Sequence, residues 1–157
     1  MHRDGKREDR SPAEQAEFDT MLKHVNALYL GMQVLLIMDL SYASRFWTQF
    51  EAWLSMQRTT ERGLSSAVGS PSEQRYEVVG VLNAKDASQR LLIEEMWGTA
   101  TPEEAHDKLK QNDVTVTNQK DKEIVLPKIL AINKAVMLAF YSSLAAEELL
   151  QSSELRD

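Results

Sequence analysis

The segment from Val34 to Gln57, VLLIMDLSYASRFWTQFEAWLSMQ, constrains the fold more than any other part of the sequence. Its beginning belongs to a run from Gln33 to Met38 that is apolar on both alternating sides. Such a run is too short for a lone helix and is typical of a strand covered on both faces, as in a parallel sheet. A Ser-Tyr-Ala-Ser turn then leads into an aromatic-rich helix that we expect to end near Arg58, with a serine of the turn as its cap. The segment predicts a strand–turn–helix unit at the centre of the fold.

Two further helices are indicated by capping signals. The sequences SPAE, at residues 11–14, and TPEE, at residues 101–104, have the same design. Each offers a hydroxyl cap, a proline at the first helical position and a glutamate that completes a capping box. The first predicts an amphipathic helix that ends at Gly31, because glycine commonly terminates helices. The second predicts a short helix that ends near Lys110.

The remaining segments complete an alternation of helices and strands. We expect strands at residues 76–82 and 113–118, a helix at residues 86–97, loops at residues 58–72 and 118–123, and a last helix that Pro127 starts. Alternation of this kind indicates βαβ crossovers and a parallel sheet. The predicted fold class is α/β, a three-layer parallel sheet of about three strands with flanking helices. We expect a disordered arm at residues 1–10, a single domain at residues 11–150 and a frayed tail at residues 151–157.

Composition excludes several classes of function. The 157 residues carry a net charge of -6 and have no clustered basic segment, which argues against a general nucleic-acid binder. The chain has no cysteine, and its three histidines have no ligand-like spacing, so we expect no metal site. No signal peptide follows the charged N-terminus, and the longest uninterrupted apolar run is far too short to span a membrane. These features predict a soluble, cytoplasmic protein that does not bind membranes.

One carboxylate, Glu51, lies on an otherwise apolar helix surface. Trp47, Glu51 and Leu54 follow one another at helical spacing, so they share one side of the helix. A carboxylate in such a place must be hydrogen-bonded, have a raised pKa or line a cleft. The structural alternative is that Glu51 pairs with Arg45, with Arg58 or with a neighbouring helix and only stabilises the fold.

Polar residues also gather just after the first predicted strand. Asp39, Ser41, Tyr42 and Ser44 occupy the carboxyl end of that strand and the N-terminus of the next helix. Ligands of open parallel sheets bind at the carboxyl ends of the strands. Free N–H groups at a helix N-terminus favour anions. These four residues are therefore candidate binding residues beside Glu51.

This segment resembles the third strand and third helix of TIR (Toll/interleukin receptor) domains. The resemblance covers residues 11–150 in the order of elements, but only residues 39–54 in motif. It implies a flavodoxin-like parallel sheet in which the later predicted strands are the family's fourth and fifth. The matching motif positions are Ser41, Tyr42, Ala43, Ser44, Trp47 and Glu51.

In the enzymatic branch of that family, the matching glutamate is essential for cleaving the nicotinamide–ribose bond of NAD. The resemblance implies that Glu51 contacts the ribose and supports an oxocarbenium-like transition state, as a carboxylate can. Trp47 would shape the pocket, and Ser44 would lie at its rim. NAD would be the substrate, and no cofactor or metal would be required.

The resemblance also predicts a partial domain. The sequence starts too late to contain the family's first two strands and the nucleotide-binding loop between them, so the strand from Gln33 to Met38 becomes an open edge. Because open edges tend to pair with other chains, we expect a protein partner or self-association to cover it. The expected function is an intracellular interaction and signalling module. The alternatives are an NAD glycohydrolase that uses Glu51, or a fragment without independent function.

Overall fold

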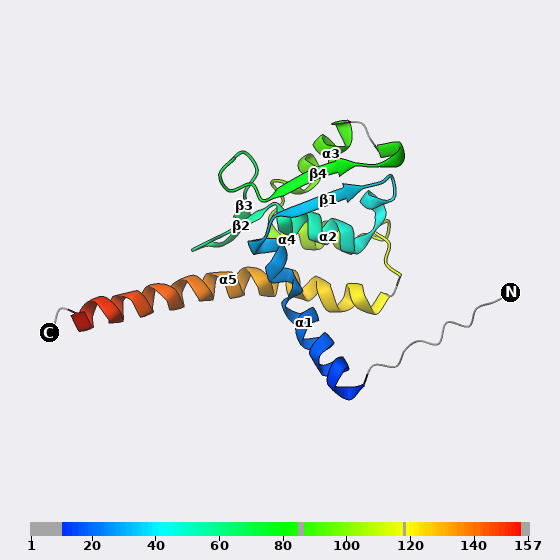
Figure 1. Cartoon of the computed structure of the whole chain (residues 1–157). Coiled ribbons are helices and arrows are strands. Elements are labelled where there is room, and N and C mark those ends of the chain that lie inside the picture. The colour runs from blue at the N-terminus through cyan, green and yellow to red at the C-terminus, as the bar shows by residue number, and fades with distance from the viewer. Residues whose placement is uncertain (1–10, 85–86, 118, 155–157) are drawn as a thin grey trace.

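The computed structural model describes residues 11–84, 87–117 and 119–154. Helices predominate, and the strands form two small sheets (Figure 1). The elements in chain order are α1 (Pro12–Gly31), β1 (Val34–Met38), the 3-10 helix η1 (Tyr42–Ser44), α2 (Phe46–Ser55), β2 (Gln57–Thr60), β3 (Gly63–Ser66), β4 (Tyr76–Gly80), the 3-10 helix η2 (Leu82–Ala84), α3 (Ala87–Trp97), α4 (Pro102–Lys110) and α5 (Gln119–Glu154). The predicted arm at residues 1–10 and the last three residues of the predicted tail lie outside the described part of the chain.

The two capping signals act as predicted. Ser11 and Thr101 each accept a hydrogen bond from the backbone N–H three residues later, and each capping box is complete. The helices α1 and α4 therefore begin where the sequence indicates. Helix α1 also ends at Gly31, as expected.

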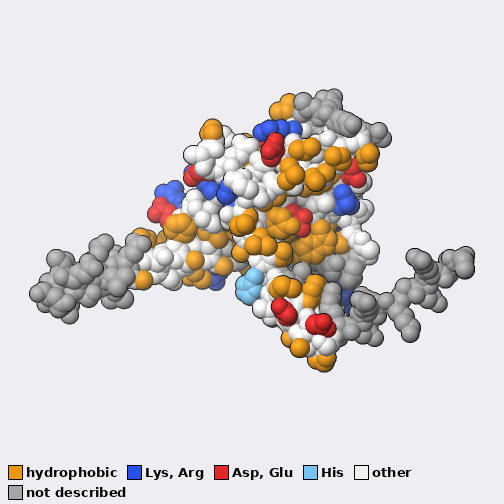
Figure 2. All heavy atoms as spheres, in the orientation of Figure 1, with side chains coloured by type: hydrophobic (Ala, Val, Ile, Leu, Met, Phe, Trp, Pro, Cys, Tyr) orange, Lys and Arg blue, Asp and Glu red, His pale blue; other side chains and the backbone are white. Residues whose placement is uncertain are grey.

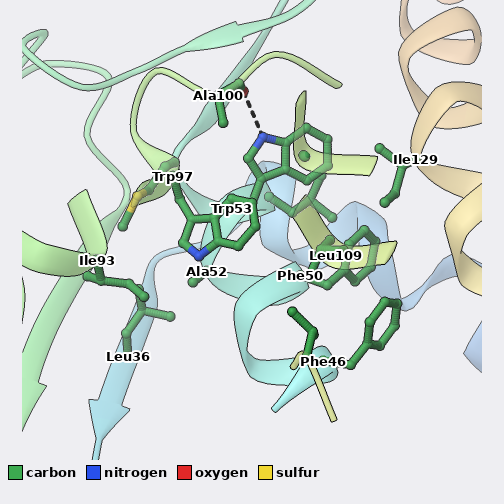
Figure 3. Packing of buried hydrophobic residues seen from close by; sticks show 14 of the residues in the cluster. Leu36, Phe46, Phe50, Ala52, Trp53, Ile93, Trp97, Ala100, Leu109 and Ile129 are labelled. Carbon is green, nitrogen blue, oxygen red and sulfur yellow. Dashed lines mark hydrogen bonds between the residues drawn. The ribbon is translucent and has the colours of Figure 1, made fainter. Parts of the chain in front are cut away.

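Strands β1 and β4 form a two-stranded parallel sheet, in which Leu36 is paired with Val78. One face of this sheet is buried, and there Leu36 points toward Ile93 of α3 (Figure 3). Leu35 and Ile37 alternate onto the opposite face and are 57% and 55% exposed. The expectation of a strand covered on both faces was therefore wrong, because the described helices pack on one face only. Figure 2 shows apolar side chains gathered over the uncovered sheet.

The third predicted strand, at residues 113–118, is absent from the described chain. Residues 112–115 form a turn and one isolated parallel bridge, between Thr115 and Arg45. The N–H of Phe46 donates to the carbonyl of Thr115 at 2.8 Å, and the N–H of Thr115 donates to the carbonyl of Ser44 at 2.7 Å. This segment therefore uses its backbone bonds on the start of α2 and adds no strand to β4. The result is a mixed helix-and-strand fold with a small parallel sheet and flanking helices.

The segment predicted as a loop at residues 58–72 contains a hairpin. Strands β2 and β3 pair antiparallel, with Thr59 opposite Leu64. Gly63 has a φ of 98°, a conformation that glycine adopts without steric cost. The N–H of Leu64 donates to Oδ1 of Asn133 in α5 at 2.7 Å. This tertiary anchor explains why a segment without a clear apolar alternation still forms a sheet.

Helix α5 begins eight residues before Pro127, so the prediction that this proline starts the helix was wrong. The early turns are fixed by packing and by one buried amine. Nζ of Lys122 donates to the carbonyls of Gln111, at 2.6 Å, and Val114, at 3.1 Å. Val125 is also buried, so tertiary contacts offset the missing proline donor. Beyond the body of the protein, α5 continues as a long projecting arm (Figure 1).

The core is centred on the aromatic side chains of α2 (Figure 3). Phe46 and Phe50 stack with their ring centroids 6.4 Å apart, and Trp53 follows Phe50 at 6.2 Å. Nε1 of Trp53 donates to the carbonyl of Ala100 at 2.8 Å, which gives this buried indole its polar partner. Helix α2 is thus fixed in position, and with it the side chains that it carries on its outer side.

Candidate functional site

The residues after β1 form a closed polar turn. Oδ1 of Asp39 accepts hydrogen bonds from the N–H of Ser41, at 3.0 Å, and from its hydroxyl, at 2.8 Å. Nη2 of Arg45 lies 3.4 Å from the same oxygen. The hydrogen bond from Ser41, helped by the charge of Arg45, lowers the pKa of Asp39 below its ordinary value. The hydrogen bonds between Asp39 and Ser41 therefore stabilise the turn.

The start of α2 differs from the predicted anion site. Arg45 is the cap, in place of Ser41 or Ser44, and it makes no side-chain capping bond. The hydroxyl of Ser44 donates to the carbonyl of Ser41 at 2.9 Å. The first helical N–H, of Phe46, is bound by Thr115, as described above. The Ser44 hydroxyl and the Phe46 N–H, which a bound anion would need as donors, thus already donate to backbone carbonyls of the protein.

Glu51 lies half-buried on α2 and faces a tyrosine from another helix. This tyrosine, Tyr29, lies near the end of α1, and its hydroxyl interacts with the Glu51 carboxylate closely enough to shift the pKa of both groups. Burial raises the pKa of Glu51, and the Tyr29 hydrogen bond counteracts part of that rise. Burial, followed by the bond and charge of Glu51, raises the pKa of Tyr29. The Glu51 side chain therefore lies in poorly hydrated surroundings between α1 and α2, whichever its protonation state.

Tyr42 connects this acid to the polar turn. Its side chain is buried, and its pKa is raised by burial and then by the negative charges of Glu51 and Tyr29. The carbonyl of Tyr42 accepts a hydrogen bond from the hydroxyl of Thr48 at 2.7 Å. Three oxygen-bearing groups, from α1, η1 and α2, thus influence one another electrostatically around Glu51.

Trp47 stands one helical turn before Glu51 and is half-buried. Its ring meets Phe46 edge-on at 5.7 Å and Phe50 edge-on at 6.4 Å. Trp47 is therefore an outer member of the aromatic core. Of the predicted residues, the structure gathers Tyr42, Trp47 and Glu51 around the outer side of α2, and it places Asp39, Ser41 and Ser44 in the neighbouring turn.

The sequence did not indicate Tyr29 as a partner of Glu51. In the sequence, Tyr29 is one of several large residues at helical spacing along residues 18–29, and only the general alternative of a neighbouring helix was open for Glu51. The cations that the sequence offered instead are engaged elsewhere, since Arg45 pairs with Asp39 and Arg58 pairs with Glu73 at 2.5 Å. The available signal was the tyrosine hydroxyl at the end of an otherwise apolar surface.

An apolar hollow of about 460 Å³ lies along α1. Its described lining consists of Phe18, Met21, His24, Val25 and Leu28. In the part of the chain that the structure describes, no three acidic or histidine side chains gather as a metal site would require.

The chain matches no protein-family model, and the searches of curated proteins and of solved structures found no similar protein.

Proposed function

We propose that this chain is a TIR-like protein-interaction module, of the intracellular signalling kind, that assembles through the open side of its parallel sheet. One observation carries the proposal. Strand β1 pairs with β4 on one edge and has no other strand neighbour among the described residues. Leu35, Ile37 and Val79 project from the uncovered face of the same sheet, and Val79 is 40% exposed.

Such a sheet is poorly suited to remain alone in water. Two strands are fewer than an independently stable sheet usually needs. The free edge of β1 offers unpaired backbone groups to another strand, and contiguous exposed apolar residues commonly mark interaction surfaces. An added strand would therefore gain backbone hydrogen bonds and cover apolar side chains together.

In the purified protein, the partner available to the sheet is a second copy of the chain. Antiparallel pairing of β1 with β1 of the second copy has two-fold symmetry and joins two small sheets into one. The TIR-like reading rests on the order of elements around this sheet. A polar turn and an aromatic helix follow β1, and β4 then returns parallel to it.

A second candidate function, hydrolysis of NAD, is favoured by the setting of Glu51. The carboxylate is half-buried and its pKa is raised, Trp47 lies one turn before it on α2, and Tyr42 is near enough for the charge of Glu51 to raise its pKa. We rank it second because the turn beside Glu51 is closed by its own hydrogen bonds, which leave Asp39, Ser41 and Ser44 engaged with one another and with the backbone. Release of nicotinamide from NAD by the purified protein, lost in Glu51→Gln and kept in Glu61→Gln, would reverse this order.

The interaction proposal is tested by light scattering over a range of protein concentrations. We expect a mass above that of the monomer, which falls in the double variant Leu35→Lys/Ile37→Lys. The matched control, Thr59→Lys/Thr99→Lys, adds the same charge at exposed positions outside the parallel sheet and should leave the mass unchanged. A monomeric mass at high concentration, or equal masses in both double variants, would contradict the proposal.

A further inference from the structure

Helix α5 extends well beyond the domain that it helps to build. Its first half is part of the core, where Val125 is 3% exposed and Ile129 is fully buried. Its second half projects away from the other elements (Figure 1). There Leu138, Tyr141 and Leu144 are 57%, 59% and 47% exposed. The projecting half thus presents large apolar side chains to water.

These exposed side chains form a continuous row. Leu130, Lys134, Leu138, Tyr141 and Leu144 recur at helical spacing, so they share one side of α5, and all of them are exposed. No charged residue occurs at residues 135–146. Apolar rows of this kind are normally covered, and a helix in water gains most of its stability from such packing.

A lipid bilayer fits this row less well than a protein does. The segment Lys122–Ala146 is long and apolar enough to cross a membrane by length and composition, with a mean hydropathy of 1.6. However, Lys122, Val125 and Ile129 fix its first turns inside the domain. The uncharged remainder, residues 135–146, measures about 18 Å as a helix. A bilayer core requires roughly 30 Å.

We infer that the projecting half of α5 pairs antiparallel with the same segment of a second copy of this chain. The charges in the sequence select the direction. Lys134 precedes the uncharged segment, and Glu148 follows it at a spacing that returns to the same side of the helix. Antiparallel pairing about a two-fold axis near Tyr141 brings Lys134 of one copy beside the Glu148 position of the other. A parallel pair would set like charges together.

The inference is tested by sedimentation velocity of the full chain, in the wild type and in the Leu35→Lys/Ile37→Lys background. That background removes association through the sheet, so the dimer that remains reports on α5 alone. We expect Tyr141→Glu to weaken this dimer at least about tenfold, because it places two carboxylates at the centre of the contact. Thr99→Glu, which adds the same single negative charge at an exposed position outside α5, should leave the dimer unchanged.

A charge exchange tests the antiparallel direction. Lys134→Glu and Glu148→Lys should each weaken the dimer several-fold, and the double variant should restore it. Failure of the double variant to restore association would overturn the antiparallel inference, even if the sheet variants behave as proposed above. Loss of all association in the sheet background would overturn it as well. Co-sedimentation of a monomeric chain with phosphatidylcholine vesicles, abolished by Tyr141→Glu, would assign the row to lipid and would also overturn it.

Discussion

Tyr29, near the end of α1, interacts with Glu51 in the middle of α2, and each residue shifts the pKa of the other. Neither residue has a cationic partner in the contacts described above. The pair lies in a poorly hydrated setting, in which Glu51 makes Tyr29 harder to ionise, whereas Tyr29 offsets part of the rise that burial causes in the pKa of Glu51. This relationship identifies Glu51 first as a link between two helices, and it generates tests that do not depend on any ligand.

Replacing Tyr29 by phenylalanine should destabilise the fold. Glu51 is half-buried and would lose the hydroxyl that interacts with it. Leaving a buried polar group unsatisfied costs about 1–3 kcal/mol, and we expect the lower end of that range here. Denaturation in urea would measure the change in the free energy of unfolding. Thr99→Val is the control, because it removes a hydroxyl at an exposed position that has no part in either proposed contact. Equal stabilities of the two variants would show that the interaction between Tyr29 and Glu51 contributes nothing to stability.

The pH dependence of Glu51→Gln tests the same pair from the other side. Because the folded state raises the pKa of Glu51, its contribution to stability is fully present below the ordinary glutamate pKa and is lost as the pH rises through the folded value. Glutamine removes that loss and keeps a polar group of similar size beside Tyr29. Thermal unfolding should therefore find Glu51→Gln more stable than the wild type at about pH 8. The advantage should shrink toward about pH 4, where the wild type is also neutral.

The control for this pH series is Glu61→Gln, at an exposed position in the hairpin turn. Its stability should follow that of the wild type across the same range. A destabilisation by Glu51→Gln that is independent of pH would contradict the assignment, because it would point to packing and not to charge.

The sequence predicted the elements whose signals are local. The SPAE and TPEE caps, the apolar run at β1 and the sequence YEVVG at β4 each specify an element without help from distant residues. Elements that depend on distant residues were misread. The hairpin needs Asn133, and the start of α5 needs the carbonyls that Lys122 binds. Residues 113–117 look like a strand, but their backbone partners lie at the start of α2.

The residues of the candidate site likewise divide into those that the sequence indicates and those that it does not. Glu51 is conspicuous in the sequence because a carboxylate is unexpected on an apolar helix surface. Its partner is not, since Tyr29 lies in another helix and is one of several large residues on the same side of it. Periodicity places a residue on a side of its own element but does not indicate which element packs there. The closed bonding of Asp39, Ser41 and Ser44 likewise depends on exact turn geometry, which spacing does not provide.

The two capping boxes should differ in their effect on global stability. Thr101→Ala removes the cap of α4, whose Ala105 and Leu109 are fully buried, so unfolding in urea should register a loss of about 1 kcal/mol. Ser11→Ala removes the same kind of cap from the exposed beginning of α1. There we expect local fraying, seen as faster amide exchange in the first turn, and little change in the global unfolding free energy. Equal global losses would show that the first turn of α1 unfolds together with the core.

Alanine substitutions at two glycines distinguish the cost of backbone strain from the cost of steric overlap. Gly63 and Gly69 both have positive φ, at 98° and 84°, so alanine is strained at either position. A Cβ at Gly63 would also overlap Oδ1 of Asn133, whereas a Cβ at Gly69 would meet no atom within 4 Å. Gly69→Ala should therefore cost about 1 kcal/mol. Gly63→Ala should cost at least about 2 kcal/mol, because it also breaks the Leu64–Asn133 bond that holds the hairpin to α5.

Amide exchange distinguishes the two effects directly. In Gly63→Ala the N–H of Leu64 should lose its protection while the N–H groups of α4 keep theirs, since the hairpin separates from α5 before the core opens. In Gly69→Ala the N–H of Leu64 should remain protected. Equal unfolding free energies for the two variants, with Leu64 protected in both, would mean that Asn133 yields to the added methyl group. The hairpin would then be held to α5 by side-chain packing and not by that hydrogen bond.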